Sequence, residues 1–547
     1  MNTKLIAAVL SFVGPLAMAV SAAAAEPLGP SQTQLDRATE DGTNWLYVDH
    51  DYHGTRYTPI DKINRGNVGK LAPVCRYTFP DQEPSQTAPV VFNGVVYATT
   101  AHHTVALDGA TCKVVWQSQW TPKGTETFNT QRGAAIKDGK LVRGTADGWL
   151  IALDMATGHE VWTTHIADSD DGHFISMPPL IVDDLVLIGP AGAEWAAKGW
   201  VVAFSLKDGK PVWKFNTVPD PGEKGSETWG NDPKILANGG GDLWTPMSYD
   251  VAKGLLFVPV GNPAPDNFDA PRPGANLYTD SLVALDVHTG QLAWYYQEVR
   301  HDVLDLDLTH VAPIFDIKIG GKQRQLVATT GKDGLLRVLD RDTHQLVYSV
   351  PFTTRQNLGH PFVDAGFGPL VCPGALGGNE WNGAAYSAKS QTLFSPAADW
   401  CYQVRRDKEA PDPAVQKKKG FYFGGQFKFT DWKTGAKGWL TAFDAATGKQ
   451  LWRYRAGKPL VGAVLATGGD LVFSGDLNGD LHAFDAKTGK VLFTHNVGGP
   501  LGGGLVSYQA GGEQYVASVS GYVGVYNQVA PELGGANPTI TVFALAR

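Results

Sequence analysis

The chain has 547 residues, with 46 lysines and arginines against 54 aspartates and glutamates, so its formal net charge is −8. A mildly acidic chain without a basic block gives no reason to expect a nucleic-acid ligand. Length alone suggests roughly three or four domains. The 64 glycines and 16 tryptophans, together with little helical periodicity, instead favour one large all-β body.

The first 25 residues have the pattern of a secretory signal peptide. Lys4 supplies a positive charge, an apolar run extends from Leu5 to Val20, and three alanines at 23–25 offer a cleavage site. The apolar run is too short and too interrupted for a membrane span. We expect residues 1–25 to be removed, residues 26–547 to form a single domain, and the protein to be periplasmic without a membrane span; a membrane anchor is the alternative.

Four cysteines in an exported chain predict two disulfides. We expect Cys75 to pair with Cys112 and Cys372 with Cys401, because each pair brackets one repeat-sized segment, although sequence alone leaves the connectivity open. The sequence has no Cys-x-x-Cys-His motif, and therefore predicts no covalent c-type haem.

One sequence phrase recurs along the chain. Each copy is a strand, an Asp-x-x-Thr-Gly turn and a second strand that ends in an aromatic residue. The glycine permits a positive φ, and the Asp and Thr side chains bond the turn backbone. A period of about 40–50 residues built from hairpins predicts propeller blades. The copies cover residues 105–116, 151–162, 202–213, 282–294, 337–348, 441–452 and 482–493.

These seven copies predict eight blades, because the long interval before 441 holds a degenerate repeat at 384–401. Residues 402–436 are an insertion relative to the repeat and are expected to form loops on one face of the propeller. Since a blade cannot bury its own faces, the repeats should close into a ring, with segment 514–527 pairing near the start. A linear solenoid is the alternative, disfavoured because it leaves open edges. The sequence therefore predicts an all-β, eight-bladed β-propeller with W-type docking repeats.

Motifs outside the repeats resemble those of the PQQ-dependent alcohol dehydrogenases, from about residue 40 to the end of the chain. The resemblance implies pyrroloquinoline quinone (PQQ) in the axial funnel of the ring and one bound metal ion. It also implies oxidation of an alcohol to an aldehyde by metal-assisted hydride transfer to the quinone. The motifs lie at 49–71, 189–200, 239–250, 260–267, 272–286, 300–307, 329–334 and 377–386.

The same resemblance implies individual site residues. Taken singly, Glu194 and Asn262 are typical of turns, and Trp244 is typical of a tryptophan that docks one blade on another. Asp305 and Lys332, taken singly, are typical of solvent-exposed surface residues. Within the motifs, Asp305 is the base for the alcohol proton and Lys332 offsets charge on the quinone oxygen. The metal ligands are Glu194, Asn262, Asp305 and Asp307, and the cofactor contacts are Gln86, Arg132, Ser176, Gly192, Ala193, Trp244, Lys332 and Glu380.

This chain departs from the family pattern at several positions. The stretch 126–133 lacks the family's neighbouring cysteine pair, and Leu304 replaces a tryptophan. Gln86 and Glu380 stand where a glutamate and an asparagine are usual. These departures leave the identity of the alcohol substrate open. Asp307 lies where lanthanide-using members carry an acid, so we expect a lanthanide(III) ion in preference to Ca²⁺.

Without a haem motif of its own, the enzyme is expected to pass electrons to a separate c-type cytochrome. Two other functions stay open at this point. One is a quinoprotein for sugars, polyols or a polymeric alcohol, and the other is a non-catalytic periplasmic propeller that assists outer-membrane assembly. The second shares the repeat phrase but has no need of Glu194, Asn262, Asp305 and Lys332.

Overall fold

The computed structural model describes Met1 and residues 29–230, 232–359 and 361–546. Residues 2–25 of the expected signal peptide lie outside the described residues. The described part folds into eight sheets, antiparallel except where β1 (Tyr57–Thr58) pairs in parallel with β30 (Leu465–Thr467), that follow one another along the chain as the blades of a β-propeller. None of its helices is long and apolar enough to cross a membrane.

The first four blades each take four consecutive strands, with the innermost strand first. Their second and third strands are buried on both faces, because the neighbouring blades cover them, which explains their nearly continuous apolar sequences. Blade 1 contains β3 (Val90–Phe92), β4 (Val95–Thr99), β5 (His103–Asp108) and β6 (Val114–Gln119); blade 2 β7 (Ala135–Lys137), β8 (Lys140–Gly144), β9 (Trp149–Asp154) and β10 (Glu160–His165); blade 3 β11 (Leu180–Val182), β12 (Leu185–Ile188), β13 (Trp200–Ser205) and β14 (Pro211–Asn216); and blade 4 β15 (Ser248–Asp250), β16 (Leu255–Val260), β17 (Ser281–Asp286) and β18 (Leu292–Gln297).

The last four blades are less regular, because two of them borrow strands from the start of the chain. Blade 5 contains β19 (Leu308–His310), β20 (Ile314–Ile319), β21 (Lys322–Gly331), β22 (Leu335–Asp340) and β23 (Leu346–Pro351); blade 6 β24 (Ala385–Ser387), β25 (Thr392–Asp399), β28 (Lys437–Asp444) and β29 (Gln450–Ala456); blade 7 β30 (Leu465–Thr467), β31 (Leu471–Gly475), β32 (Asp480–Asp485) and β33 (Val491–Asn496), with β1 (Tyr57–Thr58) added to β30; and blade 8 β34 (Leu505–Ala510), β35 (Glu513–Ser520), β36 (Thr539–Leu545) and β2 (Leu71–Thr78).

The prediction of eight blades is confirmed, but the assignment of the degenerate blade is wrong. Segment 384–401 supplies β24 and β25, which are the inner half of the blade whose outer half carries the phrase at 441–452. The eighth blade lies at the C-terminus and lacks the phrase, because its outermost strand comes from the N-terminal part of the chain.

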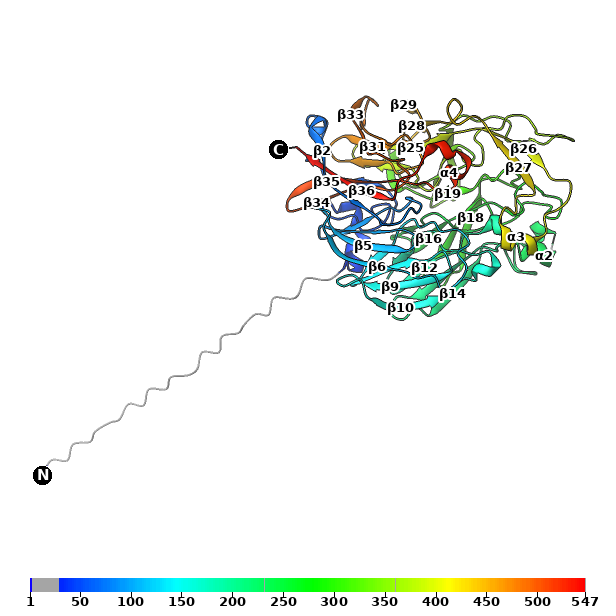
Figure 1. Cartoon of the computed structure of the whole chain (residues 1–547), viewed down its shortest axis with the longest axis horizontal. Coiled ribbons are helices and arrows are strands. Elements are labelled where there is room, and N and C mark those ends of the chain that lie inside the picture. Colours follow the sequence, from blue (N-terminus) through cyan, green and yellow to red (C-terminus); the bar gives the residue numbers. More distant parts are fainter. Residues whose placement is uncertain (2–28, 231, 360, 547) are drawn as a thin grey trace.

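Ring closure is made by β2 and β36, which pair antiparallel from Leu71 opposite Leu545 to Thr78 opposite Thr539. Figure 1 shows blue β2 beside red β35 and β36. The expected closing segment, 514–527, contains most of β35, which lies one strand further in than β36 and does not itself pair with β2.

As predicted, repeat turns dock on the final aromatic residue of the preceding blade. In blade 1, Trp116 Nε1 donates to the carbonyl of Met155 in the turn of blade 2 at 2.8 Å. A β-carbon at Gly158 of that turn would lie 2.4 Å from the Trp116 ring, so only glycine fits there. Blade 5 has His344 in place of this glycine, at φ +59°, and its ring stacks on Trp294 with centroids 4.4 Å apart.

Short helices and one small hairpin occupy the connections. The insertion at 402–436 forms β26 (Tyr402–Arg406), α3 (Pro413–Lys419) and β27 (Gly425–Phe429), which lie to one side of the ring in Figure 1. The other helices are α1 (Gln32–Asp36), α2 (Pro233–Leu236) and α4 (Val525–Val529), with 3-10 turns η1 (Ala38–Glu40), η2 (Val68–Lys70), η3 (Ser169–Asp171), η4 (Ala193–Trp195), η5 (Ser226–Trp229) and η6 (Pro531–Leu533).

Both predicted disulfides are present, Cys75–Cys112 and Cys372–Cys401. Cys75 lies in β2 of blade 8 and Cys112 in the turn that follows β5 of blade 1. This disulfide therefore links the first and last blades beside the closing strands.

Candidate active site

Asp305 lies in a tight loop between β18 and β19, which connects blades 4 and 5. The carboxylate of Asp302 shapes this loop by accepting hydrogen bonds from the amides of Leu304 (3.0 Å) and Leu306 (2.8 Å). Asp305 has a φ of +59°, in the left-handed region that non-glycine residues rarely adopt. Such conformations concentrate at functional sites, where surrounding contacts enforce them.

Lys332, directly after β21, is shared between two acids of the same loop. Its Nζ lies 2.7 Å from Asp305 Oδ1 and 2.7 Å from Asp307 Oδ2, and all three side chains are buried. Burial raises the pKa of Asp305 well above its usual range, and Lys332 opposes this rise. Although burial alone would lower the pKa of Lys332, the carboxylates of Asp305 and Asp307 raise it well above its usual value. The lysine is therefore held as a cation.

A group of carboxylates suited to a cation lies beside this pair. Ligand oxygens of Glu194, Asp266 and Asp305 all lie within 4.8 Å of one another. Both carboxylate oxygens of Asp266 and the Oδ1 of Asn262 are buried without a hydrogen-bond partner among the described residues. Buried polar atoms normally have partners, and hard cations such as Ca²⁺ take oxygen ligands of these types. The residues present therefore fit a metal ion.

Of the four expected metal ligands, the structure brings Glu194 and Asp305 together, with Asn262 on the neighbouring loop. Asp307 has other contacts, because its Oδ1 accepts from the amide of Asn262 at 2.8 Å and its Oδ2 pairs with Lys332. Asp266 completes the group instead. Sequence patterns did not reveal it, although it lies four residues beyond Asn262 in the same motif.

Glu194 lies in η4, and a further acid missed from sequence, Asp242, fixes this turn. Its Oδ2 accepts from the amides of Gly192 (2.8 Å) and Ala193 (3.2 Å). These two expected cofactor contacts thus use their amides inside the protein. Burial, reinforced by Glu194, raises the pKa of Asp242 well above its usual range.

Trp244 is flanked by two buried cations. The Arg132 guanidinium lies 5.0 Å from the centroid of the Trp244 ring, and Lys332 Nζ lies 5.4 Å from it. Arg132 also donates to Ser176 Oγ (2.8 Å) and to the Trp244 carbonyl (2.9 Å). No described carboxylate forms an ion pair with Arg132. An aromatic surface bordered by cations suits a flat, anionic cofactor.

The remaining expected cofactor contacts, Gln86 and Glu380, both contact the segment at 523–526. Gln86 Nε2 donates to the carbonyl of Val523 at 3.3 Å, and its Oε1 is buried without a partner among the described residues. Glu380 accepts from the Tyr526 hydroxyl at 3.4 Å. Burial raises the pKa of Glu380 to about 7.

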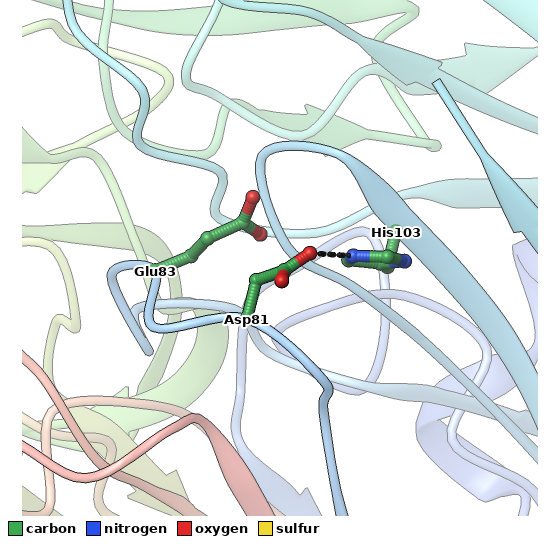
Figure 2. A group of neighbouring side chains, drawn as sticks. All are labelled: Asp81, Glu83 and His103. Carbon is green, nitrogen blue, oxygen red and sulfur yellow. Dashed lines mark hydrogen bonds and ion pairs between the residues drawn. The ribbon is translucent and has the colours of Figure 1, made fainter. Parts of the chain in front are cut away.

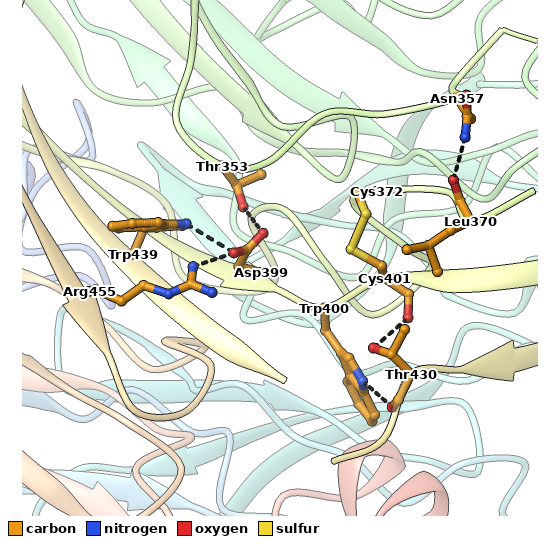
Figure 3. The surroundings of a disulfide bond; sticks show 10 residues. All are labelled: Thr353, Asn357, Leu370, Cys372, Asp399, Trp400, Cys401, Thr430, Trp439 and Arg455. Carbon is orange, nitrogen blue, oxygen red and sulfur yellow. Dashed lines mark hydrogen bonds and ion pairs between the residues drawn. A yellow bond between two sulfur atoms is a disulfide. The ribbon is translucent and has the colours of Figure 1, made fainter. Parts of the chain in front are cut away.

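The Cys372–Cys401 disulfide is shown with its surroundings in Figure 3, and the residue that follows it contacts the Asp305 loop. Tyr402, the residue after this disulfide, exchanges backbone hydrogen bonds with Val371 at 2.8 and 3.0 Å. Its hydroxyl donates to the carbonyl of Leu304 at 2.9 Å. Since Leu304 precedes Asp305, the disulfide fixes the strand that contacts the Asp305 loop.

A second group of potential ligands, Asp81, Glu83 and His103, lies in blade 1 and the segment before it (Figure 2). His103 Nε2 lies 2.7 Å from Asp81 Oδ2. The adjacent His102 contacts Glu83 through Nδ1 and lies 2.8 Å from Glu126 Oε1 through Nε2. The stretch that lacks the family's cysteine pair thus contributes to an ion-pair network through Glu126.

Comparisons with known proteins agree with this geometry. Residues 45–356 match the family model of the glucose/ethanol/alcohol dehydrogenase β-propeller domain, and residues 436–529 match that of outer membrane protein assembly factor BamB. The latter range contains none of the residues expected from sequence to bind the metal ion or the cofactor. The quinone alcohol dehydrogenase subunit of Acetobacter aceti is 30% identical, over 94% of this chain and 78% of that protein.

Quinoprotein alcohol dehydrogenase PedH of Pseudomonas putida is 31% identical, over 88% of this chain and 86% of its own length. The solved structure of quinohemoprotein alcohol dehydrogenase ADHIIG from Pseudomonas putida HK5 has a TM-score of 0.88 and 26% identity, covering 95% of this chain and 83% of that one. Fold and site together define an enzyme of the quinoprotein class. The chain belongs to the PQQ-dependent alcohol dehydrogenases. A purely structural propeller scaffold is thereby excluded.

Proposed function

We propose that this enzyme is a periplasmic dehydrogenase that oxidises a small alcohol to the aldehyde, with PQQ and one metal ion. The observation that carries the proposal is the buried pair of Asp305 and Lys332, located next to oxygen ligands without partners and to the cation-flanked ring of Trp244. When bound, PQQ supplies the acceptor for two electrons and the metal ion supplies a Lewis acid.

The residues around these groups have distinct tasks. Glu194, Asn262 and Asp305 would hold the metal ion. Asp307, the fourth metal ligand expected from sequence, contacts the amide of Asn262 and Lys332. Trp244 provides the flat surface for the cofactor. The polar contacts for its edge come from Gln86, Arg132, Ser176, Lys332 and Glu380. Gly192 and Ala193, also expected from sequence, line the site with their amides held by Asp242.

Asp305 accepts the hydroxyl proton of the substrate at a carboxylate oxygen. Burial disfavours the ionised form that this step needs, and the nearby Lys332 cation opposes that effect. Holding base and alcohol in one fixed, buried place supplies the positional part of the rate gain. Lys332 also places a positive charge next to the cofactor surface, where it offsets negative charge that develops there.

We propose a lanthanide(III) ion in preference to Ca²⁺. Three carboxylates, from Glu194, Asp266 and Asp305, have ligand atoms within 4.8 Å of one another. A trivalent ion balances this cluster, whereas a divalent ion leaves one negative charge uncompensated in a largely buried place.

The proposed location and electron acceptor follow from other features. The N-terminal pattern and the two disulfides are typical of exported proteins, since disulfides persist in oxidising compartments. The sequence has no haem-attachment motif, which favours transfer of electrons to a separate c-type cytochrome. Rapid reduction of oxygen to stoichiometric peroxide without a carrier would contradict this acceptor.

The proposal is tested by loading the purified protein with PQQ and either La³⁺ or Ca²⁺, then assaying alcohols with an artificial dye. Small primary alcohols should be oxidised only when both PQQ and the ion are present, and faster with La³⁺. Sugars, polyols and a polymeric alcohol complete the panel and distinguish the alternative substrates. Full activity without an added ion, after removal of bound metal, would refute the proposed chemistry.

A further inference from the structure

We propose that Asp266 is a direct ligand of the metal ion and that Asp307 is instead a partner of Lys332. This inference rests on the proposed metal-dependent function. It assigns an additional ligand that the family resemblance does not supply, at a position four residues beyond Asn262.

The first argument is the isolation of the Asp266 side chain. Asp266 is fully buried, with an exposed fraction of 0%, and neither of its carboxylate oxygens has a hydrogen-bond partner among the described residues. An unpaired buried carboxylate is costly, and buried charges in proteins are normally paired or coordinate metals. A bound cation would supply the partner that the carboxylate oxygens of Asp266 lack.

The second argument is the position of this carboxylate. Its ligand oxygen lies within 4.8 Å of those of Glu194 and Asp305, so one ion between them reaches all three. Asn262 Oδ1, on the same loop, is likewise buried without a partner in the described part of the chain. Carboxylate and amide oxygens form the ligand set of a hard cation.

The third argument concerns Arg272, the buried cation nearest in sequence. Its guanidinium donates to the carbonyls of Pro265 (3.1 Å), Asp266 (2.8 Å) and Asp302 (2.7 Å), and to Asn276 Oδ1 (2.8 Å). Arg272 therefore bonds the backbone of Asp266 and leaves its carboxylate free. It also ties the Asp266 loop to the loop of Asp305.

Asp307 shows the opposite pattern. Its two carboxylate oxygens are engaged, one by the amide of Asn262 at 2.8 Å and the other by Lys332 Nζ at 2.7 Å. Both carboxylate oxygens of Asp307 thus already have hydrogen-bond or ion-pair partners inside the protein, although Lys332 is shared with Asp305. The additional negative charge that favours a trivalent ion comes from Asp266.

The test compares Asp266→Asn with the matched control Asp307→Asn, using Tb³⁺ as the probe in metal-free protein. Binding is followed by luminescence, and lifetimes in H₂O and D₂O count the water molecules bound to the ion. Loss of the Asp266 ligand should weaken Tb³⁺ binding by about 10- to 100-fold or more and let additional water reach the ion. Asp307→Asn should leave the water count of the parent unchanged.

A second readout is independent of luminescence. Because Asp266→Asn removes an uncompensated buried charge, the metal-free variant should melt at a higher temperature than the metal-free parent. Its gain in melting temperature on adding Tb³⁺ should be smaller, since ligand stabilisation follows affinity. Asp266→Ala repeats both measurements with a side chain that cannot coordinate.

Unchanged Tb³⁺ affinity and water count in both Asp266 variants would overturn the assignment while leaving the proposed function intact. The expected binding changes without alcohol oxidation by the loaded parent would overturn the proposed function and leave the ligand in place. A parent that binds neither Tb³⁺ nor Ca²⁺ would overturn both.

Discussion

Lys332 Nζ lies 2.7 Å from Asp305 Oδ1, and both side chains are buried. This contact joins a strand end in blade 5 to the loop that precedes the same blade. A buried cation here prevents Asp305 from being an isolated charge, which would otherwise be protonated or expelled to solvent. The Lys332 cation therefore favours the ionised form of Asp305, against the effect of burial, which raises the pKa of Asp305.

The first prediction concerns Asp305 as the proposed base. Asp305→Asn should lower kcat of the loaded enzyme by about 10²–10⁴-fold, because the amide cannot accept the alcohol proton. Turnover is measured with saturating PQQ and metal. The control is Asp269→Asn, which removes a partly exposed carboxylate paired with His301 and Arg406 and should keep near-parental turnover. Parental turnover in the Asp305 variant would refute its assignment.

The second prediction tests the docking of blade 3 on blade 4. Gly290 has a φ of +70°, and a β-carbon there would lie 2.3 Å from the Trp213 ring. Gly254 has nearly the same φ, +67°, but its β-carbon would meet no described atom within 4 Å. Gly254→Ala should cost about 1–2 kcal/mol of unfolding free energy from the backbone alone. Gly290→Ala should cost about 1–3 kcal/mol more, measured by urea unfolding; equal losses would contradict the docking.

The third prediction concerns the disulfide beside the ring closure. Replacing Cys75 and Cys112 by alanine should remove about 2–4 kcal/mol of stability, because the link constrains the unfolded chain. Thermal unfolding with and without reductant measures this loss. The double Cys372→Ala, Cys401→Ala variant is the comparison: it should lose a similar amount of stability, since it opens a loop of similar length, and should in addition lower turnover through the Asp305 loop. If reductant destabilised the Cys75/Cys112 variant as much as the parent, the prediction would fail.

The fourth prediction concerns pH and a repeat turn. Asp286 accepts hydrogen bonds from the hydroxyl (2.8 Å) and amide (2.9 Å) of Thr289, and the hydroxyl contact above all lowers the pKa of Asp286. A lowered folded-state pKa means that this stabilisation is present above the unfolded pKa of about 3.9 and is lost as pH falls through the folded value. Asp286→Ala should therefore destabilise the protein at pH 6 more than at pH 3, as measured by urea unfolding. A pH-independent difference would contradict this.

Much of the fold was accessible from sequence because the repeat phrase encodes its own turn and docking contact. The Asp and Thr side chains form the turn, and the final tryptophan contacts the glycine of the next blade. Blade 8 could not be predicted in this way, because its outer strand is β2 and it carries no copy of the phrase. The place of blade 8 in the ring is determined by strand pairing between segments that are distant in sequence, which a local sequence pattern cannot indicate.

The residues of the candidate site were likewise predicted only in part. The resemblance pointed to Asp305 and Lys332, which the structure places in contact. The resemblance did not indicate Asp266 or Asp242, because an aspartate in a Pro- and Gly-rich loop cannot be distinguished by sequence from an ordinary turn residue. What distinguishes Asp266 is a buried carboxylate without a partner in the described chain, and only packing reveals that property.

The closing pair of β2 and β36 also dictates when the enzyme can become functional. Thr78 and Thr539, which face each other across this pair, are 461 positions apart in sequence. A chain emerging N-terminus first must keep the edge of β2 unpaired until β36 arrives, and unpaired edges invite wrong association. The ring can therefore close only after β36 (Thr539–Leu545) has been made, and a chain that stops before this strand retains an open edge.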